Sequence, residues 1–249
     1  MLLSGKQYLI TGASFDSEIG FAICKTLSEN GANLTLCARN SDSLARTHTA
    51  LTSGKHDIAP FDLRQLDDIS AWVKSLVSQN GAYDGIVHSA SYQGYTPLKM
   101  LSPKQISQYF DINFSAAAML IAAFSKKSHL NPRSSLVMIG SAAGLQGLKA
   151  RALYAASKAA LLSLVKTSAI ELADKAIRVN YLAPAVVNGA KSQHQFATLG
   201  ETQSKNLKDA HPLGISEPDD VANAVLFLLS ELSNKTTGAV LPVDGGYLA

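Results

Sequence analysis

The sequence contains little that could crosslink the chain or attract a strongly charged partner. Only 2 of its 249 residues are cysteine, 16% are charged, and the formal net charge is +3. Two isolated thiols do not make a disulfide framework, so a reducing compartment is expected. The small net charge, without a basic cluster, argues against nucleic acid or an anionic membrane as a partner.

Long hydrophobic runs are also missing. The longest strongly apolar stretch, Ala116 to Phe124, is too short to cross a bilayer. The N-terminus enters a predicted strand directly, without the charged segment or cleavage site of a signal peptide. Hydrophobic residues still make up 47% of the chain, enough for a sizeable core. We therefore expect a soluble, cytoplasmic protein, and the sequence predicts no metal site.

Short apolar segments alternate regularly with longer amphipathic ones. This alternation predicts an α/β protein with one domain over residues 1–249: a Rossmann-type, doubly wound, seven-stranded parallel sheet with helices on both faces. The predicted strands cover residues 7–11, 33–38, 56–61, 85–89, 135–140, 178–182 and 239–243. The predicted helices lie near residues 20–30, 42–52, 65–80, 103–127, 152–173 and 218–231.

Residues 185–216 interrupt this alternation because they are polar and lack a clear period. They follow a predicted strand directly. A long insertion at the carboxyl end of a strand is where an open α/β sheet would carry a lid over a substrate. We expect this segment to be a substrate lid.

Tyr154 and Lys158 are the residues that say most about chemistry. They are four apart in a predicted helix, so both side chains leave the same face. A neighbouring ammonium favours phenolate and would lower the tyrosine pKa from its ordinary value of ~10. Ser141, at the end of a predicted strand, could hydrogen-bond a carbonyl oxygen while the tyrosine protonates it. This set suits the reduction of a ketone or the oxidation of an alcohol.

The first predicted strand ends in a glycine-containing turn that runs from Thr11 to Gly20. Glycine at this place lets the chain turn tightly and lets a pyrophosphate approach the backbone. The N-terminus of the following helix then offers free N–H groups to the anion. Alone, such a turn is weak evidence for a nucleotide site.

Several spaced motifs make the evidence specific. In chain order they are Thr11-Gly12 with Ile19-Gly20, Asp62-Leu63, Asn113, Gly140-Ser141, Tyr154-x-x-x-Lys158, Arg178-Val-Asn180 with Pro184, and Gly238 with Val243-Asp-Gly-Gly246. With this order and spacing the chain resembles the short-chain dehydrogenase/reductase family over essentially its whole length. Within the family it is most similar to single-domain members of the 3-oxoacyl-carrier-protein reductase type.

The resemblance implies a role for each catalytic position. Tyr154 would be the general acid and base, and Lys158 would lower its pKa and hold the nicotinamide ribose. Ser141 would orient the substrate oxygen. Asn113 would keep a helix locally open and hold a water in a proton relay through Lys158, or it could be only a structural helix residue.

The resemblance also implies a set of cofactor contacts. They would be the pyrophosphate contacts Gly12, Ser14 and Ile19, the adenine contacts Asp62 and Leu63, the ribose-side contacts Ser89 and Ala90, and the backbone of Val187 against the carboxamide. Asp62 could instead be only a helix N-cap. The family's assembly implies a homotetramer in which helices near 103–127 and 152–173 pair with their mates, with a dimer as the fallback.

The chain departs from the family pattern at four places. The phosphate loop is longer, with Glu18 where the middle glycine usually stands, so Asp16 and Glu18 must point outward or the loop must bulge. The usual Asn-Asn-Ala-Gly is replaced by residues 88–91, His-Ser-Ala-Ser. The usual Pro-Gly is Pro184-Ala, and Gly189 takes the place of a threonine that contacts the cofactor.

The choice of cofactor depends on the end of the second predicted strand. Relatives that use NAD usually have an aspartate at position 38 to bind the ribose 2′-hydroxyl, but this chain has Ala38. Arg39 could pair with a 2′-phosphate. We expect NADP, with NAD the less favoured cofactor.

Two other functions stay open at this stage. The longer loop and the segment 84–89 resemble the enoyl-carrier-protein reductases of the same family, which space the tyrosine and lysine seven apart; here the position seven before Lys158 is Arg151. The second is a catalytically silent NADP-binding sensor or scaffold. The substrate could be a small carbonyl compound or a carrier-bound acyl chain.

Overall fold

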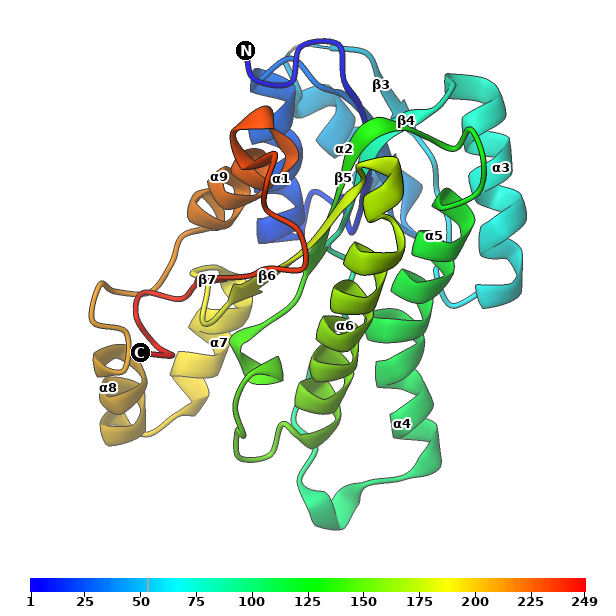
Figure 1. Cartoon of the computed structure of the whole chain (residues 1–249). Helices are drawn as coiled ribbons and strands as arrows, with labels where there is room; N and C mark the ends of the chain where they lie inside the picture. Colours follow the sequence, from blue (N-terminus) through cyan, green and yellow to red (C-terminus); the bar gives the residue numbers. More distant parts are fainter. Residues whose placement is uncertain (53) are drawn as a thin grey trace.

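A computed structural model describes residues 1–52 and 54–249. Seven parallel strands form one sheet in the order β3-β2-β1-β4-β5-β6-β7, which confirms the predicted doubly wound sheet (Figure 1). The strands are β1 (Gln7–Thr11), β2 (Asn33–Cys37), β3 (His56–Ile58), β4 (Tyr83–His88), β5 (Leu130–Ile139), β6 (Arg178–Pro184) and β7 (Val240–Val243).

Helices cover both faces of the sheet. They are α1 (Glu18–Glu29), α2 (Ser41–Ala50), α3 (Ile69–Asn80), α4 (Pro103–Phe110), α5 (Ala116–Phe124), α6 (Ala152–Glu171), α7 (Ala190–Thr198), α8 (Glu201–Asp209) and α9 (Pro218–Leu229). Helix α1 packs against α9 on one face, and α3, α5 and α6 pack in a row on the other (Figure 1).

Alternation along the strands divides the hydrophobic core into two layers. On β1, Leu9 joins the core under α3, α5 and α6, whereas Ile10 joins the core under α1 and α9. Met138 and Val137 of β5 separate in the same way. Since successive side chains of a strand leave opposite faces, each short apolar strand is buried on both sides.

Local signals in the sequence set where several helices begin. The Ser17 hydroxyl accepts from the Gly20 amide at 3.3 Å and caps α1. The Ser102 hydroxyl accepts from the Gln105 amide at 3.3 Å and caps α4, whose first residue is Pro103. Such caps satisfy amides that have no partner inside the helix.

The helix predicted over residues 103–127 is interrupted. A π-helical segment, Asp111–Ser115, separates α4 from α5. The lid segment also differs from its expected irregular form, because it contains the two helices α7 and α8. The strand predicted over 56–61 ends earlier, at Ile58.

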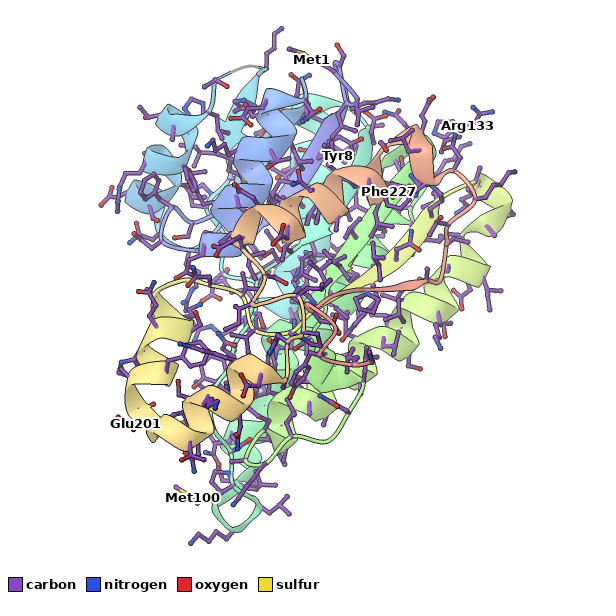
Figure 2. All side chains as sticks on the ribbon, turned by 90° about the vertical axis from the view of Figure 1, so that its left-hand side faces the viewer. Met1, Tyr8, Met100, Arg133, Glu201 and Phe227 are labelled. Atoms are coloured by element: carbon purple, nitrogen blue, oxygen red, sulfur yellow. The ribbon has the colours of Figure 1, made fainter. Side chains whose placement is uncertain are left out.

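The carboxyl ends of the strands gather at one end of the molecule. Figure 2 labels Met1 and Arg133 at one end, and Met100 and Glu201 at the opposite end. Met100 lies in the connection after β4, and Glu201 begins α8 of the lid segment. Strand order reverses between β1 and β4, which is where an open α/β sheet forms a binding crevice at its carboxyl ends.

Within the described parts of the chain, no helix combines the length and apolar character needed to cross a membrane. The same residues contain no group of three metal-ligating side chains placed to hold an ion. Cys24 on α1 and Cys37 on β2 are free and buried.

Candidate active site

Three of the predicted catalytic side chains meet beside β5. Tyr154 and Lys158 lie one turn apart on α6, and Ser141 follows the end of β5. The Ser141 side chain acts on the Tyr154 phenol and lowers its pKa, and the Lys158 ammonium lies 5.8 Å from the centre of the Tyr154 ring. Lys158 is only 1% exposed, and its Nζ donates to the Ile139 carbonyl at 2.8 Å.

The acid–base properties of this group differ from the sequence expectation. Burial raises the pKa of the Tyr154 phenol, although hydrogen bonds with Ser141 and Ser91 and the charge of Arg151 act in the opposite direction. Burial also lowers the pKa of Lys158 to about 7. The prediction that Lys158 lowers the tyrosine pKa is therefore wrong for this structure, because the lysine is itself desolvated and its charged form is disfavoured.

Tyr181 on β6 holds the backbone of Ser141. Its hydroxyl accepts from the Ser141 amide at 2.9 Å and donates to the Ser141 carbonyl at 3.1 Å. The Ser141 hydroxyl also accepts from the Ala143 amide at 3.1 Å. Tyr181 was not among the predicted site residues, and its only signal in the sequence is that it follows the Arg178-Val-Asn180 motif.

Asn113 lies in the π-helical segment and is fully buried. Its Oδ1 accepts from the Tyr92 amide at 2.7 Å and from the Ser91 hydroxyl at 3.2 Å. Its Nδ2 donates to the Tyr92 carbonyl at 2.8 Å and to the Ser157 hydroxyl at 2.9 Å. These four bonds use the whole capacity of the amide. A relay water would therefore have to bind the backbone carbonyls of the widened helix rather than this side chain.

His88, the last residue of β4, connects the π-helical segment to the first strand. Its Nδ1 lies 2.9 Å from the Thr11 hydroxyl, and its Nε2 lies 3.4 Å from the Ile112 carbonyl. A proton on Nε2 satisfies both contacts, with the Thr11 hydroxyl donating to Nδ1. Burial lowers the pKa of His88 to about 3, so the ring is neutral at physiological pH. The sequence marks His88 as a departure from the family pattern and as part of the segment 84–89, but does not predict these contacts.

The predicted phosphate loop packs against the segment after β4. A Cβ at Gly12 would lie 2.7 Å from the Ala90 amide nitrogen and 2.9 Å from the Ser89 carbonyl carbon, and Gly12 has a φ of +73°. Only glycine suits that approach and that backbone conformation. The structure thus brings Gly12, Ser89 and Ala90 together.

The acidic side chains of the loop bind partners outside its turn, which is one of the two alternatives that the sequence left open. Asp16 pairs with Arg46 of α2 at 3.2 Å and accepts from the Ser43 hydroxyl at 3.1 Å. The Ser14 hydroxyl lies 2.6 Å from that of Ser43. Glu18 accepts from the Ala190 amide, at the start of α7, at 2.9 Å. The loop is therefore a cradle that an anionic pyrophosphate fits, because its carboxylates are engaged elsewhere.

The other predicted cofactor residues lie around the same edge of the sheet. Leu63 is buried, and Arg39 is exposed just after the end of β2. Ile19 and Val187 are partly buried and pack against the core that lies under α1 and α9. The backbone of Val187 also forms a bridge with Ser216.

Asp62 forms an ion pair with Arg64. Their hydrogen bonds are the largest cause that lowers the pKa of the Asp62 carboxyl, and the charge of Arg39 adds to the effect. Asp62 is not a helix N-cap. A 3-10 turn, Leu66–Asp68, comes directly before α3, and its N-cap residue is Gln65.

Known proteins resemble this chain over its full length. The family model described as "Enoyl-(Acyl carrier protein) reductase" matches residues 12–248. The 3-oxoacyl-[acyl-carrier-protein] reductase FabG of Chlamydia muridarum is 31% identical over 249 residues, which cover 98% of each chain. The L-xylulose reductase of Caenorhabditis elegans is 32% identical over 248 residues, which cover 97% of this chain and 95% of the relative.

A solved structure agrees with these sequence matches. The short-chain dehydrogenase/reductase of Serratia marcescens superposes over 100% of both chains with a TM-score of 0.90 at 26% sequence identity. Taken with the seven-stranded parallel sheet and the Ser141, Tyr154 and Lys158 cluster, these matches show that the chain belongs to the short-chain dehydrogenase/reductase family of oxidoreductases.

Proposed function

We propose that this protein is an NADP-dependent oxidoreductase that interconverts a carbonyl group and a secondary alcohol, with Tyr154, Ser141, Lys158 and Asn113 as its functional set. The observation that carries the proposal is the cluster itself: Ser141 follows β5 and acts on the Tyr154 phenol, and Lys158 lies one turn along the same helix as Tyr154. This cluster lies at the carboxyl end of the sheet, where the fold forms its crevice.

Each residue has a distinct task in this proposal. The Ser141 hydroxyl holds the substrate oxygen, and the Tyr154 hydroxyl gives that oxygen its proton during reduction and takes it back during oxidation. When bound, NADPH supplies the hydride that the carbonyl carbon receives. Lys158 holds the nicotinamide ribose, and Asn113 maintains the π-helical segment beside the site. Burial favours the protonated phenol, which suits a group that must donate a proton.

The proposed cofactor contacts follow the edge described above. Gly12, Ser14 and Ile19 would meet the pyrophosphate, Asp62 and Leu63 the adenine, Ser89 and Ala90 the ribose side, and Val187 the carboxamide. Arg39 would pair with the 2′-phosphate of NADP. The charge of Arg39 lowers the pKa of the Asp62 carboxyl, which supports a position near the proposed adenine contacts.

Enoyl reduction is the second candidate, because the matching family model carries that description. The structure offers no tyrosine hydroxyl at the enoyl-type position, which Arg151 occupies. Its guanidinium lies 4.3 Å from the centre of the Tyr95 ring and donates to the Gly94 carbonyl at 3.2 Å. The spacing of Tyr154 and Lys158 therefore supports carbonyl reduction.

The substrate itself belongs to a broad class. We propose a small or carrier-bound carbonyl compound covered by residues 185–216, in a cytoplasmic homo-oligomer. Among the relatives, one is named for an acyl-carrier substrate and another for a sugar, so the shared chemistry is the carbonyl rather than the rest of the molecule.

Replacement of Tyr154 by phenylalanine tests the proposal. NADPH oxidation would be measured on a panel of ketones, β-ketoesters, diketones and enoyl thioesters. We expect Tyr154→Phe to lower kcat by ~10²-fold or more on the best carbonyl substrate while NADPH affinity changes little, because only the proton donor is lost. Tyr95→Phe, which keeps its ring over Arg151, is the matched control.

Three outcomes would contradict this assignment. Retention of most activity by Tyr154→Phe would exclude the tyrosine as the proton donor. NADPH binding without turnover on any panel member would favour the silent sensor or scaffold, and turnover restricted to enoyl thioesters would favour the second candidate.

A further inference from the structure

Two departures from the family pattern lie next to each other in the folded chain. Glu18 stands in the phosphate loop where the family usually has a glycine, and Gly189 stands where it usually has a threonine. They are far apart in sequence, yet a Cβ at Gly189 would lie 2.7 Å from Glu18 Cγ and 2.9 Å from its Oε1. The side chain that is missing at position 189 leaves the space that the side chain at position 18 fills.

Glu18 uses that space to bind the first lid helix. Its Oε1 accepts from the amide of Ala190, the first residue of α7, at 2.9 Å. A carboxylate at a helix N-terminus satisfies an amide that has no partner within the helix, and it faces the positive end of the helix dipole. The contact therefore joins the first residue of α1 to the first residue of α7.

The rest of the lid is attached independently of Glu18. Near the strand, Asn188 Nδ2 donates at 3.0 Å to Oε1 of Glu217, the residue before α9. At the far end, the Leu213 amide donates to the Gly245 carbonyl at 2.9 Å, and the His211 ring stacks on Tyr247 with 4.7 Å between centroids. Within the described residues, Glu18 is thus the side chain that links the phosphate loop to the start of α7.

We infer that Glu18 is a positioning residue that anchors the lid to the phosphate loop, and that Gly189 is the complementary residue that makes room for it. The inference rests on the proposed function, because it takes residues 185–216 to be the lid over the carbonyl substrate. Since the loop that would receive the pyrophosphate carries the anchor, lid position and cofactor site are mechanically connected. Loss of the anchor should weaken substrate capture more than the chemical step.

Hydrogen–deuterium exchange of the cofactor-free protein tests the anchor without any activity measurement. We expect Glu18→Ala to speed amide exchange in residues 190–209 about 10-fold, the scale expected when a charge-assisted hydrogen bond is lost. Glu18→Gln keeps a carbonyl acceptor and should restore most of the protection. Asp16→Ala, which removes a carboxylate of the same loop that pairs with Arg46 instead, should leave exchange in 190–209 unchanged.

A double-mutant cycle tests the complementarity of the two positions. Gly189→Thr alone should displace Glu18 and release the lid at least as much as Glu18→Ala does. Glu18→Gly combined with Gly189→Thr should exchange no faster than Glu18→Gly alone, because the added side chain then meets open space. Circular dichroism and thermal unfolding of each variant would establish that it is folded.

Kinetics provide the separate functional readout. Glu18→Ala should raise KM for the carbonyl substrate about 5-fold or more and leave kcat within about 2-fold, since the anchor positions the lid and not the reacting groups. Unchanged exchange in Glu18→Ala, or additive effects in the cycle, would overturn the inference. Faster exchange without any carbonyl turnover in the wild-type protein would support the anchor and contradict the proposed function.

Discussion

Individual side chains at the site are governed by burial more than by their neighbours in sequence. Lys158 is 1% exposed and bonded to a backbone carbonyl, and its pKa is lowered to about 7. Tyr154 on the same helix face has its pKa raised by burial. A lysine and a tyrosine four residues apart therefore do not by themselves give a phenol of low pKa. Burial removes water from both groups, and this desolvation disfavours the charged form of each.

The shifted pKa of Lys158 predicts a pH dependence of stability. The unfolded chain binds a proton at this lysine up to the ordinary value of 10.5, whereas the folded chain releases it near 7. Between these values the unfolded state holds more protons, so the free energy of unfolding should rise with pH. Urea unfolding of the cofactor-free protein at pH 7 and pH 9 should show this rise in the wild type and a smaller one in Lys158→Met. Lys25→Met, exposed on α1, is the control. An identical pH slope in the wild type and Lys158→Met would contradict the prediction.

Arg39 carries the prediction for the cofactor. Arg39→Leu should weaken NADPH binding by roughly 1.5–3 kcal/mol, the scale of a hydrogen bond between charged groups, and should leave NADH binding nearly unchanged. Fluorescence titration with both cofactors measures the difference. Arg133→Gln, at the end of the molecule opposite Met100 and Glu201 in Figure 2, should affect neither cofactor. Equal losses for NADPH and NADH, or a wild-type preference for NADH, would rule out the 2′-phosphate contact.

At the scale of secondary structure, the π-helical segment is the element on which the site most depends. It breaks the helical run between α4 and α5 and turns Asn113 toward the loop after β4 and toward Ser157 on α6. Burying the Asn113 amide costs little free energy because all four of its hydrogen bonds are made. Without this amide, its partners would be buried with unmade hydrogen bonds, and their lost hydration would destabilise the fold. The wider turn is stabilised by tertiary contacts rather than by helix propensity.

Removal of the Asn113 amide should therefore affect both stability and activity. Asn113→Ala removes the side-chain partner of the Tyr92 backbone and one of the two partners of the Ser157 hydroxyl, so we expect a loss of about 1–3 kcal/mol in the free energy of unfolding and a lower kcat. Urea unfolding and steady-state kinetics measure the two effects. Asn206→Ala on exposed α8 should change neither. Wild-type stability in Asn113→Ala would show that the π-helical segment does not need this side chain.

At the scale of the whole molecule, α6 presents a surface that suits a second copy of the chain. Ile170 is 79% exposed, and the alanines at 156 and 159 on the same helix are also exposed. Small residues let another helix approach closely, and an apolar face of this kind is usually covered in soluble proteins. Tyr154 and Lys158 lie on the same helix, so a partner would also stiffen the site.

The mass in solution tests this prediction. Light scattering at micromolar concentration should give about four times the chain mass of 26.3 kDa, or twice that mass if only the dimer forms. Full activity in a species with the mass of one chain would contradict it, whereas an inactive monomer would agree with a role for assembly in the site.

The sequence by itself determined the features that depend on local pattern and spacing. Alternation of apolar segments predicts the parallel sheet. The glycine after the first strand predicts the phosphate loop only together with the other spaced motifs, and the spacing of Ser141, Tyr154 and Lys158 predicts a cluster that the structure shows. Each of these signals lies within a few residues or along one helix face, where backbone geometry translates spacing directly into position.

The tertiary structure decided what depends on burial and on contacts between distant segments. The directions of the pKa shifts at Tyr154 and Lys158 follow from burial away from water. The spacing of residues in the sequence does not indicate how deeply a side chain is buried. The partners of Asn113, the contact of His88 with Thr11, and the meeting of Glu18 with Gly189 join residues from different elements. These contacts and pKa shifts arise only when the helices pack on the sheet. Desolvation and contact between side chains depend on the packed core and not on any one segment of the chain.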